Sequence, residues 1–409
     1  MLNATGALVM SGNPDISRDI YSLCTIFAIA ALVPLVLGLL RIPVAEVVFL
    51  IVFGVIFGPE MLGWIQLTGS IIMLSQIGIG FLFFAAGLEL EKHAIRGRSG
   101  KLALVGWLAS VALAIVAAGA LEYLGIIRDF AGVAIALTST ALGTLLPVLR
   151  DKGLLHTDFG TYFMGAGAIG EFGPVLAISL LLTAKNPVMG AIAIALFGVV
   201  AVIIAKVPGR LKSDRVMNLV ESGHNTSSQT AIRLTVLLLM ILLAVAEFFG
   251  LDIALGAFVA GIILKLYASG EETSLLQTKL VGLAFGIFIP LFFVVSGAKL
   301  NIDSIIANPG LLFLFFGLLL VVRGVPQFFI YRRALPEARE RTRFSLYVAT
   351  ALPIIVAVTS IETDNEVMRP EVAAALVGAG ALSVLVFPLV AQILGPRIAP
   401  QEERAAATA

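Results

Sequence analysis

Two ionisable residues lie deep within apolar stretches of this sequence, where a charge is costly. Glu171 follows the small residues Gly165-Ala-Gly-Ala-Ile-Gly170 and precedes Phe-Gly-Pro174. Arg323 lies in Leu-Leu-Val-Val-Arg323-Gly-Val-Pro326. An ionisable group at such depth is a candidate functional residue, because a membrane or a protein core gives it little solvation. Since burial favours the neutral form of a carboxyl group, Glu171 is either a proton carrier or a neutral, hydrogen-bonded structural acid. For Arg323 we expect an acidic partner or a water-filled cavity, the alternative being a side chain that extends to the interface.

Two further apolar stretches carry polar interruptions near their middle. The first contains Thr138, Ser139 and Thr140, and the second contains Thr350 followed by Pro353. Hydroxyl groups can satisfy carbonyls in an ordinary membrane helix, so either interruption alone is weak evidence. Two interrupted helices at matching positions of inverted halves, however, indicate a substrate site near the middle of the membrane in a secondary transporter.

The composition requires that most of the chain faces lipid. Of 409 residues, 59% are hydrophobic and only 13% are charged, with a mean hydropathy of +1.04. Soluble proteins carry roughly 25% charged residues, so this chain cannot cover a soluble surface. A net charge of +1 argues against nucleic acid as a partner, and the single cysteine excludes a disulfide framework. We therefore expect an all-α polytopic membrane protein.

Apolar runs of about 17–25 residues suit a membrane-spanning helix, and shorter ones a tilted or partial helix. Thirteen candidates follow, at roughly 20–40, 44–57, 68–88, 102–121, 131–149, 161–183, 187–205, 234–249, 253–266, 280–298, 311–331, 344–361 and 372–393. The second and the ninth are short. The interrupted spans are then the fifth and the twelfth, and an odd separation places them in opposite orientations.

The basic residues predict the orientation of these spans. Loops after the odd-numbered spans, with the C-terminus, hold 21 of the 27 Lys and Arg residues. Because cytoplasmic loops are enriched in Lys and Arg, the N-terminus is predicted outside and the C-terminus in the cytoplasm. The connection 206–228 reads as a cytoplasmic linker between a first half, about 20–205, and a second half, about 229–396.

Several stretches together resemble the monovalent cation:proton antiporter superfamily, in particular its Kef-like second branch with the sodium/proton exchanger domain. They include Phe53-Gly-Val-Ile-Phe-Gly58-Pro59, Gly78-Ile-Gly-Phe-Leu-Phe-Phe-Ala-Ala-Gly87-Leu-Glu89, Thr138-Ser139-Thr140-Ala141, Leu255-Gly-Ala-Phe-Val-Ala-Gly261 and Pro290-Leu-Phe-Phe-Val-Val-Ser-Gly297. The resemblance covers nearly all thirteen spans. It implies one exchanger-type domain over 1–396, followed by a short cytoplasmic tail, 397–409.

This resemblance also implies the mechanism and the site. A core domain is expected to move against a dimerising scaffold in an elevator-like form of alternating access, in a bacterial inner membrane. The ion-binding carboxylate of the family, usually an Asp after Asp, Asn or Gln, falls on Glu171 after Gly170. The basic residue of the eleventh span falls on Arg323, and the crossing residues fall on Thr138, Ser139 and Thr140 and on Thr350. A lone carboxylate favours electroneutral exchange.

We therefore expect exchange of Na⁺ or K⁺ for H⁺, with Glu171 as the site of either ion. Hydroxyl groups of Thr138, Ser139, Thr140 and Thr350 are expected to complete an oxygen shell, which suits a hard cation. The absence of a phosphate-binding loop pattern favours an ion gradient as the energy source, with no cofactor. Two alternatives stay open: a proton- or sodium-coupled organic anion transporter on the same scaffold, with Arg323 as the anchor, and a channel or sensor. No activated nucleophile or histidine cluster lies at membrane depth, so an enzyme is not expected.

Overall fold

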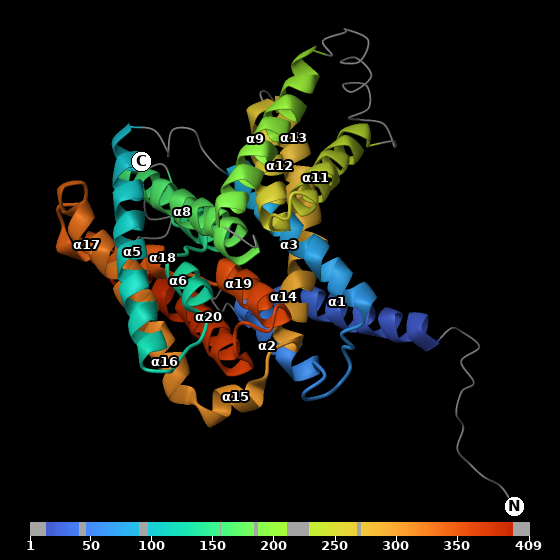
Figure 1. The fold of residues 1–409 in the computed structure, drawn as a ribbon, viewed down its shortest axis with the longest axis horizontal. Helices are drawn as coiled ribbons and strands as arrows, with labels where there is room; N and C mark the ends of the chain where they lie inside the picture. The colour runs from blue at the N-terminus through green and yellow to red at the C-terminus, as the bar shows by residue number, and fades with distance from the viewer. Residues whose placement is uncertain are drawn as a thin grey trace, which may run out of the picture. The chain divides into compact units, whose positions relative to one another are not determined.

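A computed structural model describes residues 14–40, 46–89, 97–155, 157–183, 187–210, 229–267 and 271–395 (Figure 1). In these ranges the regular secondary structure is helical throughout. Ten helices are long and apolar enough to cross a membrane, and three shorter apolar helices cover Glu46–Phe57, Phe130–Leu146 and Ile253–Leu266. These thirteen segments coincide one for one with the predicted spans, including the short second and ninth. The predicted all-α polytopic fold is confirmed.

The chain divides into two compact units, with one boundary after Leu82 and others near residues 270 and 302. The first unit contains α1 (Pro14–Leu40), α2 (Glu46–Phe57), α3 (Gly69–Glu89) as far as Leu82, α13 (Glu271–Leu283), the π-helix η2 (Ala284–Phe288) and α14 (Ile289–Ala298).

Glycines hold the first unit together by letting the backbones of α2 and α14 touch. A Cβ atom added at Gly54 would overlap the carbonyl oxygen of Val294, and one added at Gly297 would overlap that of Ile51. In lipid, helices gain little from hydrophobic association, so close packing of small residues replaces it. Stacking of the Phe81 and Phe288 rings, 4.3 Å between centroids, extends the same contact.

The second unit holds the remaining helices. They are α5 (Gly97–Tyr123), α6 (Phe130–Leu137), α7 (Leu142–Asp151), α8 (Asp158–Ala177), η1 (Ile178–Thr183), α9 (Pro187–Arg210), α11 (Thr230–Phe248), α12 (Ile253–Tyr267), α15 (Ile302–Ala307), α16 (Pro309–Leu318), η3 (Leu319–Gly324), α17 (Val325–Ile330), η4 (Tyr331–Arg333), α18 (Ala338–Ala349), α19 (Pro353–Asp364) and α20 (Pro370–Ile393).

A second glycine-mediated pair, in this unit, relates to the first as an inverted repeat would require. A Cβ atom at Gly87 in α3 would overlap the carbonyl oxygen of Phe258, and one at Gly261 in α12 would overlap that of Phe84. The first pair joins spans two and ten, and this pair joins spans nine and three. Spans two and nine are seven apart, as are spans three and ten, so corresponding spans of the two halves form the two pairs.

Both predicted interruptions are present as breaks between half-helices. The fifth span ends as α6 at Leu137 and resumes as α7 at Leu142, and the twelfth ends as α18 at Ala349 and resumes as α19 at Pro353. Proline has no N–H group and fits the first turn of a helix, which is why α19 begins at Pro353.

Wide π-helical turns interrupt the spans that carry the two buried ionisable residues. Pro174 precedes η1, in the span of Glu171, and Pro326 follows η3, which contains Arg323. A proline removes one backbone hydrogen bond, and such bulges concentrate at functional sites. Most of the predicted linker, from residue 211 on, and the tail 397–409 lie outside the described residues, so the division into halves stays a prediction.

The glycine contact of α2 with α14 gives a direct test of the packing. Gly54→Val and Gly297→Val should each lower the melting temperature of the protein in detergent, because overpacking costs about 1–3 kcal/mol. Gly282→Ala in α13 is the matched control, since a Cβ atom there meets nothing within 4 Å. Equal melting temperatures for Gly54→Val and Gly282→Ala would contradict the close contact.

Candidate functional site

The two interruptions are bonded directly to each other, within the second unit. The backbone N–H of Ala141 donates to the carbonyl oxygen of Thr350 at 2.8 Å. The hydroxyl of Thr140 donates to the carbonyl oxygen of Val348 at 2.7 Å. The carbonyls that the break in the twelfth span leaves without helical partners therefore accept bonds from the break in the fifth.

Helix α8 joins this crossing through Gly170, the residue before Glu171. The backbone N–H of Thr140 donates to the carbonyl oxygen of Gly170 at 3.0 Å. A Cβ atom at Gly170 would overlap Nη2 of Arg323 and would lie 2.7 Å from Oγ1 of Thr140. Any larger residue at this position would require the Arg323 guanidinium or Thr140 to shift, so glycine suits the arrangement.

Arg323 is completely buried, and each of its three nitrogen atoms donates to a neutral oxygen. Nε bonds to Oγ1 of Thr140 at 2.9 Å, Nη2 to the carbonyl oxygen of Ala166 at 3.0 Å, and Nη1 lies 3.4 Å from Oγ of Ser110. The sequence predicts an acidic partner or a water-filled cavity, and among the described residues no acidic side chain is hydrogen-bonded to this guanidinium.

One partner of Arg323, Thr140, is bonded to the negative end of a half-helix. Thr140 links Nε to Val348, in the last turn of α18, where helical carbonyls carry a partial negative charge. Polarised carbonyls and hydroxyls can solvate a cation without neutralising it. The positive charge of Arg323 is therefore solvated at the crossing without being cancelled by a paired carboxylate.

Glu171, the residue after Gly170 in α8, is also buried, with only 3% of its surface exposed. Its Oε2 atom has no hydrogen-bond partner among the described residues. A buried carboxylate oxygen without a donor costs about 1–3 kcal/mol or more, so a proton or a cation is needed to satisfy it. Glu89, at the end of α3, interacts electrostatically with Glu171, and its Oε2 approaches the first turn of α7 at Gly143. This carboxyl group adds negative charge near the site.

The other predicted hydroxyl groups bond within their own half-helices. Thr138 donates to the carbonyl oxygen of Ile135 at 2.8 Å, Ser139 to that of Ala136 at 2.8 Å and Thr350 to that of Leu346 at 3.0 Å. All three residues are buried. A hydroxyl that has donated its proton still has lone pairs with which to accept or ligate. The structure therefore joins Thr140, Arg323, Gly170 and the Thr350 carbonyl, while the side chains of Thr138 and Ser139 stay at the end of α6.

Three residues at or near the site were not predicted as part of it. Ser110 lies near Arg323, and Glu89 adds charge near Glu171. Ser383 in α20 supports the second break, because its Oγ accepts from the N–H of Ala351 at 3.0 Å and donates toward the carbonyl oxygens of Ala351 and Gly380. A serine within an apolar helix is a weak sequence signal, since it usually bonds to its own helix.

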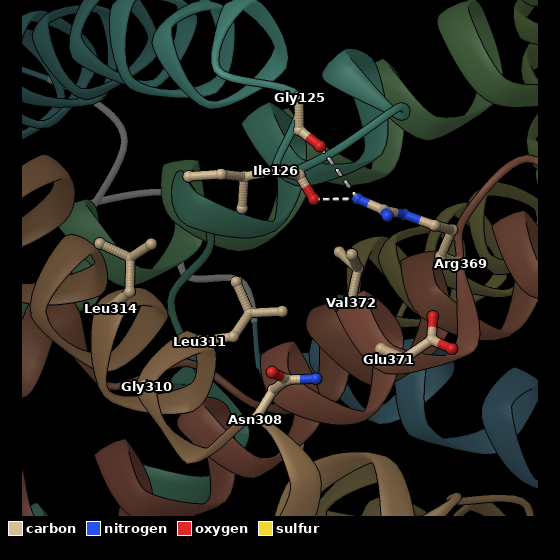
Figure 2. Close-up of a pocket in the computed structure, with 9 residues that line it drawn as sticks. All are labelled: Gly125, Ile126, Asn308, Gly310, Leu311, Leu314, Arg369, Glu371 and Val372. Carbon is tan, nitrogen blue, oxygen red and sulfur yellow. Dashed lines mark hydrogen bonds between the residues drawn. The ribbon is translucent and has the colours of Figure 1, made fainter.

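A cavity of about 610 Å³ lies elsewhere in the second unit, and Figure 2 shows it. Its lining contains none of the predicted site residues. Arg369 reaches across it, and its Nη2 donates to the carbonyl oxygens of Gly125, at 3.4 Å, and of Ile126. Within the described residues, no group of three or more His, Cys, Asp or Glu side chains could hold a metal ion.

The hydroxyl of Thr140 is the part of the site that a substitution can remove most selectively. Thr140→Val should lower the melting temperature, because it removes a donor to Val348 and an acceptor for a buried guanidinium, at about 1–3 kcal/mol per unsatisfied group. Thr140→Ser keeps the hydroxyl and should stay close to the wild type. Thermal unfolding of the purified proteins compares the two, and a loss for Thr140→Ser as large as that for Thr140→Val would contradict the special role of the hydroxyl.

Comparison with known proteins supplies the family. A profile described as "Sodium/hydrogen exchanger, transmembrane" matches residues 27–395, which is most of the chain. The protein YjbQ of Bacillus subtilis (strain 168), named for Na⁺/H⁺ antiport, is 22% identical over 410 residues. That match covers 94% of this chain and 65% of the relative. The glutathione-regulated potassium-efflux system protein KefC of Salmonella typhi is 25% identical over 366 residues, or 85% of this chain and 56% of the relative. The chain thus spans less than two thirds of the length of these relatives.

The fold has a counterpart among solved structures. The structure of a sodium proton antiporter from Methanocaldococcus jannaschii at pH 8 superimposes with a TM-score of 0.63, at 17% sequence identity, and covers 93% of this chain and 96% of that one. At this identity the likeness establishes the fold alone. With the profile match over residues 27–395, the spans and the crossed interruptions, the chain belongs to the transmembrane sodium/hydrogen exchanger family and is a multi-pass membrane protein.

Proposed function

We propose that this protein exchanges a monovalent cation, Na⁺ or K⁺, for H⁺ across the membrane, with Glu171 binding the two ions in turn. The observation that carries the proposal is the buried carboxylate whose Oε2 atom lacks a donor among the described residues, beside the crossing of two interrupted helices. The relatives named for Na⁺/H⁺ antiport and for potassium efflux support the same class of substrate.

The exchange of a cation for a proton follows from the electrostatics of the single buried carboxylate of Glu171. A protonated Glu171 is neutral and attracts a cation only weakly, whereas an ionised Glu171 is costly unless a cation neutralises it. Oxygen atoms supply the rest of a hard-cation shell, and the candidates are the hydroxyls of Thr138, Ser139, Thr140 and Thr350. Arg323 stabilises either the empty, ionised carboxylate or the negative end of α18, to which Thr140 links it.

Electroneutral exchange of one cation for one proton is the stoichiometry that we propose. The residue directly before Glu171 is glycine, and a second acid there would require Arg323 or Thr140 to shift. With a single carboxylate cycling between proton and cation, the carried charge is equal in the two directions. Clamping the membrane potential at zero should then leave the exchange rate unchanged.

The organic anion alternative is less well supported by the same contacts. A carboxylate substrate is best held by two parallel donors of a guanidinium. Nε, Nη1 and Nη2 of Arg323 already approach Thr140, Ser110 and Ala166, so the group is oriented by the protein itself. For the same reason Arg323→Lys disturbs the structure under either hypothesis, and direct uptake of labelled anions is the better discriminator.

Substitution of Glu171 tests the proposal. In inverted vesicles with an imposed pH gradient, addition of Na⁺ or K⁺ should dissipate the gradient for the wild type and for Glu171→Asp, because both keep a titratable carboxyl. Glu171→Gln should abolish the response, since an amide binds neither a proton nor a cation strongly at neutral pH.

Glu371→Gln is the matched control, since it removes an exposed acid from α20 and should leave the response intact. The assignment of Glu171 is wrong if Glu171→Gln vesicles still respond to Na⁺ or K⁺ like the wild type. A wild type that takes up a labelled carboxylate, and does not respond to either cation, would favour the organic anion transporter. Cation flux that ignores the pH gradient would favour a channel.

The membrane orientation is part of the proposal, with the N-terminus outside and the C-terminus in the cytoplasm of a bacterial cell. We further propose a homodimer and an elevator-like movement, both carried from the family resemblance. The orientation is tested in a Cys24→Ser background with one new cysteine at an exposed loop position, Glu60 or Arg339.

A membrane-impermeant maleimide on intact cells should label Glu60→Cys and not Arg339→Cys, because the first lies after span two and the second after span eleven. After permeabilisation both should be labelled, which controls for reactivity. The reverse pattern in intact cells would invert the orientation.

A further inference from the structure

Two buried acids, Asp129 and Glu362, lie at the other ends of the interrupted helices, outside the site built around Glu171. Asp129 precedes α6, and its Oδ1 atom caps that helix by accepting from the N–H of Gly132 at 2.8 Å. Glu362 lies in the last turn of α19. Their side chains are only 5% and 3% exposed, and the exchange of ions at Glu171 does not use them.

The two carboxyl groups face each other across Gly132. A Cβ atom added at Gly132 would overlap Oδ2 of Asp129 and would lie 3.1 Å from Cγ of Glu362. Oδ2 of Asp129 is buried and has no N–H or O–H donor among the described residues while both acids are ionised. A proton on Glu362 supplies that donor, and the two side chains then form a hydrogen bond.

The surrounding charges favour retention of this proton. Helix α6 packs against α5, α8, α19, η1 and η3, and α19 also packs against α20. Among the charged groups on these elements, Asp129 interacts electrostatically with Glu122, an exposed acid near the end of α5 that adds negative charge. Asp364 and Glu371, at the ends of α19 and α20, are exposed acids, and Glu171 of α8 and Arg323 of η3 belong to the site described above. Burial raises the pKa of Asp129, and the negative charge of Glu122 acts in the same direction.

We propose that Asp129 and Glu362 form a second proton-binding site, in which one shared proton fastens the start of α6 to the end of α19. Two neighbouring buried carboxylates repel each other when both are ionised, so they hold one proton between them and titrate as a pair. Loss of that proton leaves two buried negative charges and drives the two half-helix ends apart. The pH of the solution that reaches this end of the unit thus determines how firmly the start of α6 is held to the end of α19.

A second contact, made by an arginine, lies at the same end of the interrupted helices. Arg369, directly before α20, donates to the carbonyl oxygens of Gly125 and Ile126, in the connection between α5 and α6 (Figure 2). A guanidinium stays charged at any physiological pH. Deprotonation of the carboxyl pair therefore weakens the contact between Asp129 and Glu362, while Arg369 stays bonded to the connection between α5 and α6. The carboxyl pair is thus better suited to adjust this contact than to hold the fold together.

The test is the pH dependence of thermal stability, which needs no transport and so can fail independently of the proposed function. A proton held more tightly in the folded state stabilises it at low pH, and this contribution is lost as pH rises through the pKa of the folded pair. The melting temperature of the purified wild type should therefore fall as pH rises above the ordinary titration range of a carboxyl group. Buried acids outside the pair contribute falls of the same sign, among them Asp252, whose pKa burial raises to about 6, so differences between variants are the relevant measure.

Glu362→Gln and Asp129→Asn each replace the shared proton by an amide donor that does not titrate, and asparagine still caps a helix. Both variants should fold and should lose the part of the pH-dependent fall that the pair causes. Glu362→Ala removes the donor altogether and should lower the melting temperature most at low pH, where the wild type holds the shared proton. Asp364→Asn, which removes an exposed acid from the end of the same helix, should keep the full pH dependence of the wild type.

The proposal is overturned if Glu362→Gln and Asp129→Asn fall with pH as steeply as the wild type. In vesicles, the pH profile of cation-dependent exchange should likewise lose one titrating step in Glu362→Gln and keep it in Asp364→Asn.

Discussion

The hydroxyl of Thr140 is the contact on which the rest of the site depends. It donates to Val348 and accepts from Arg323, while the N–H of the same residue bonds to Gly170. One residue thus connects the two interrupted helices, the helix of Glu171 and the buried guanidinium. In an apolar surrounding every freed backbone group must find a partner within the protein, and the breaks in the fifth and twelfth spans satisfy one another through this residue.

The same contact explains how the site departs from the pattern that the sequence resembles. With Arg323 bonded to Thr140 and to Ala166, its guanidinium fills the space beside residue 170, and glycine is the residue that fits. Glu171 is then a single carboxylate in this part of α8, because a larger side chain at residue 170 would require the guanidinium or Thr140 to shift. This lone carboxylate underlies the proposed electroneutral exchange.

At the opposite ends of the same half-helices, the chain joins α6 to α19 by a different kind of bond. On our proposal Asp129 and Glu362 share a proton, which is lost as pH rises. Arg369 adds a hydrogen bond to the carbonyl oxygen of Gly125. The inner ends are held by a neutral hydroxyl and by backbone groups. The two half-helices are therefore fixed where they cross and, on our proposal, adjustable where they end.

The sequence by itself determined the spans, the two interruptions and the depth of Glu171 and Arg323. Hydropathy and proline are properties of short segments, and the membrane forces such segments into helices, so local reading is sufficient. Only the tertiary structure decided which partners these residues have. Arg323 meets Thr140 across 183 positions and Ser110 across 213, and no local pattern specifies that its partners are neutral. Asp129 and Glu362 each resemble an ordinary acid near a helix end. They form a pair because the fold brings the start of one half-helix to the end of another, and burial then makes the ionisation of each depend on the other.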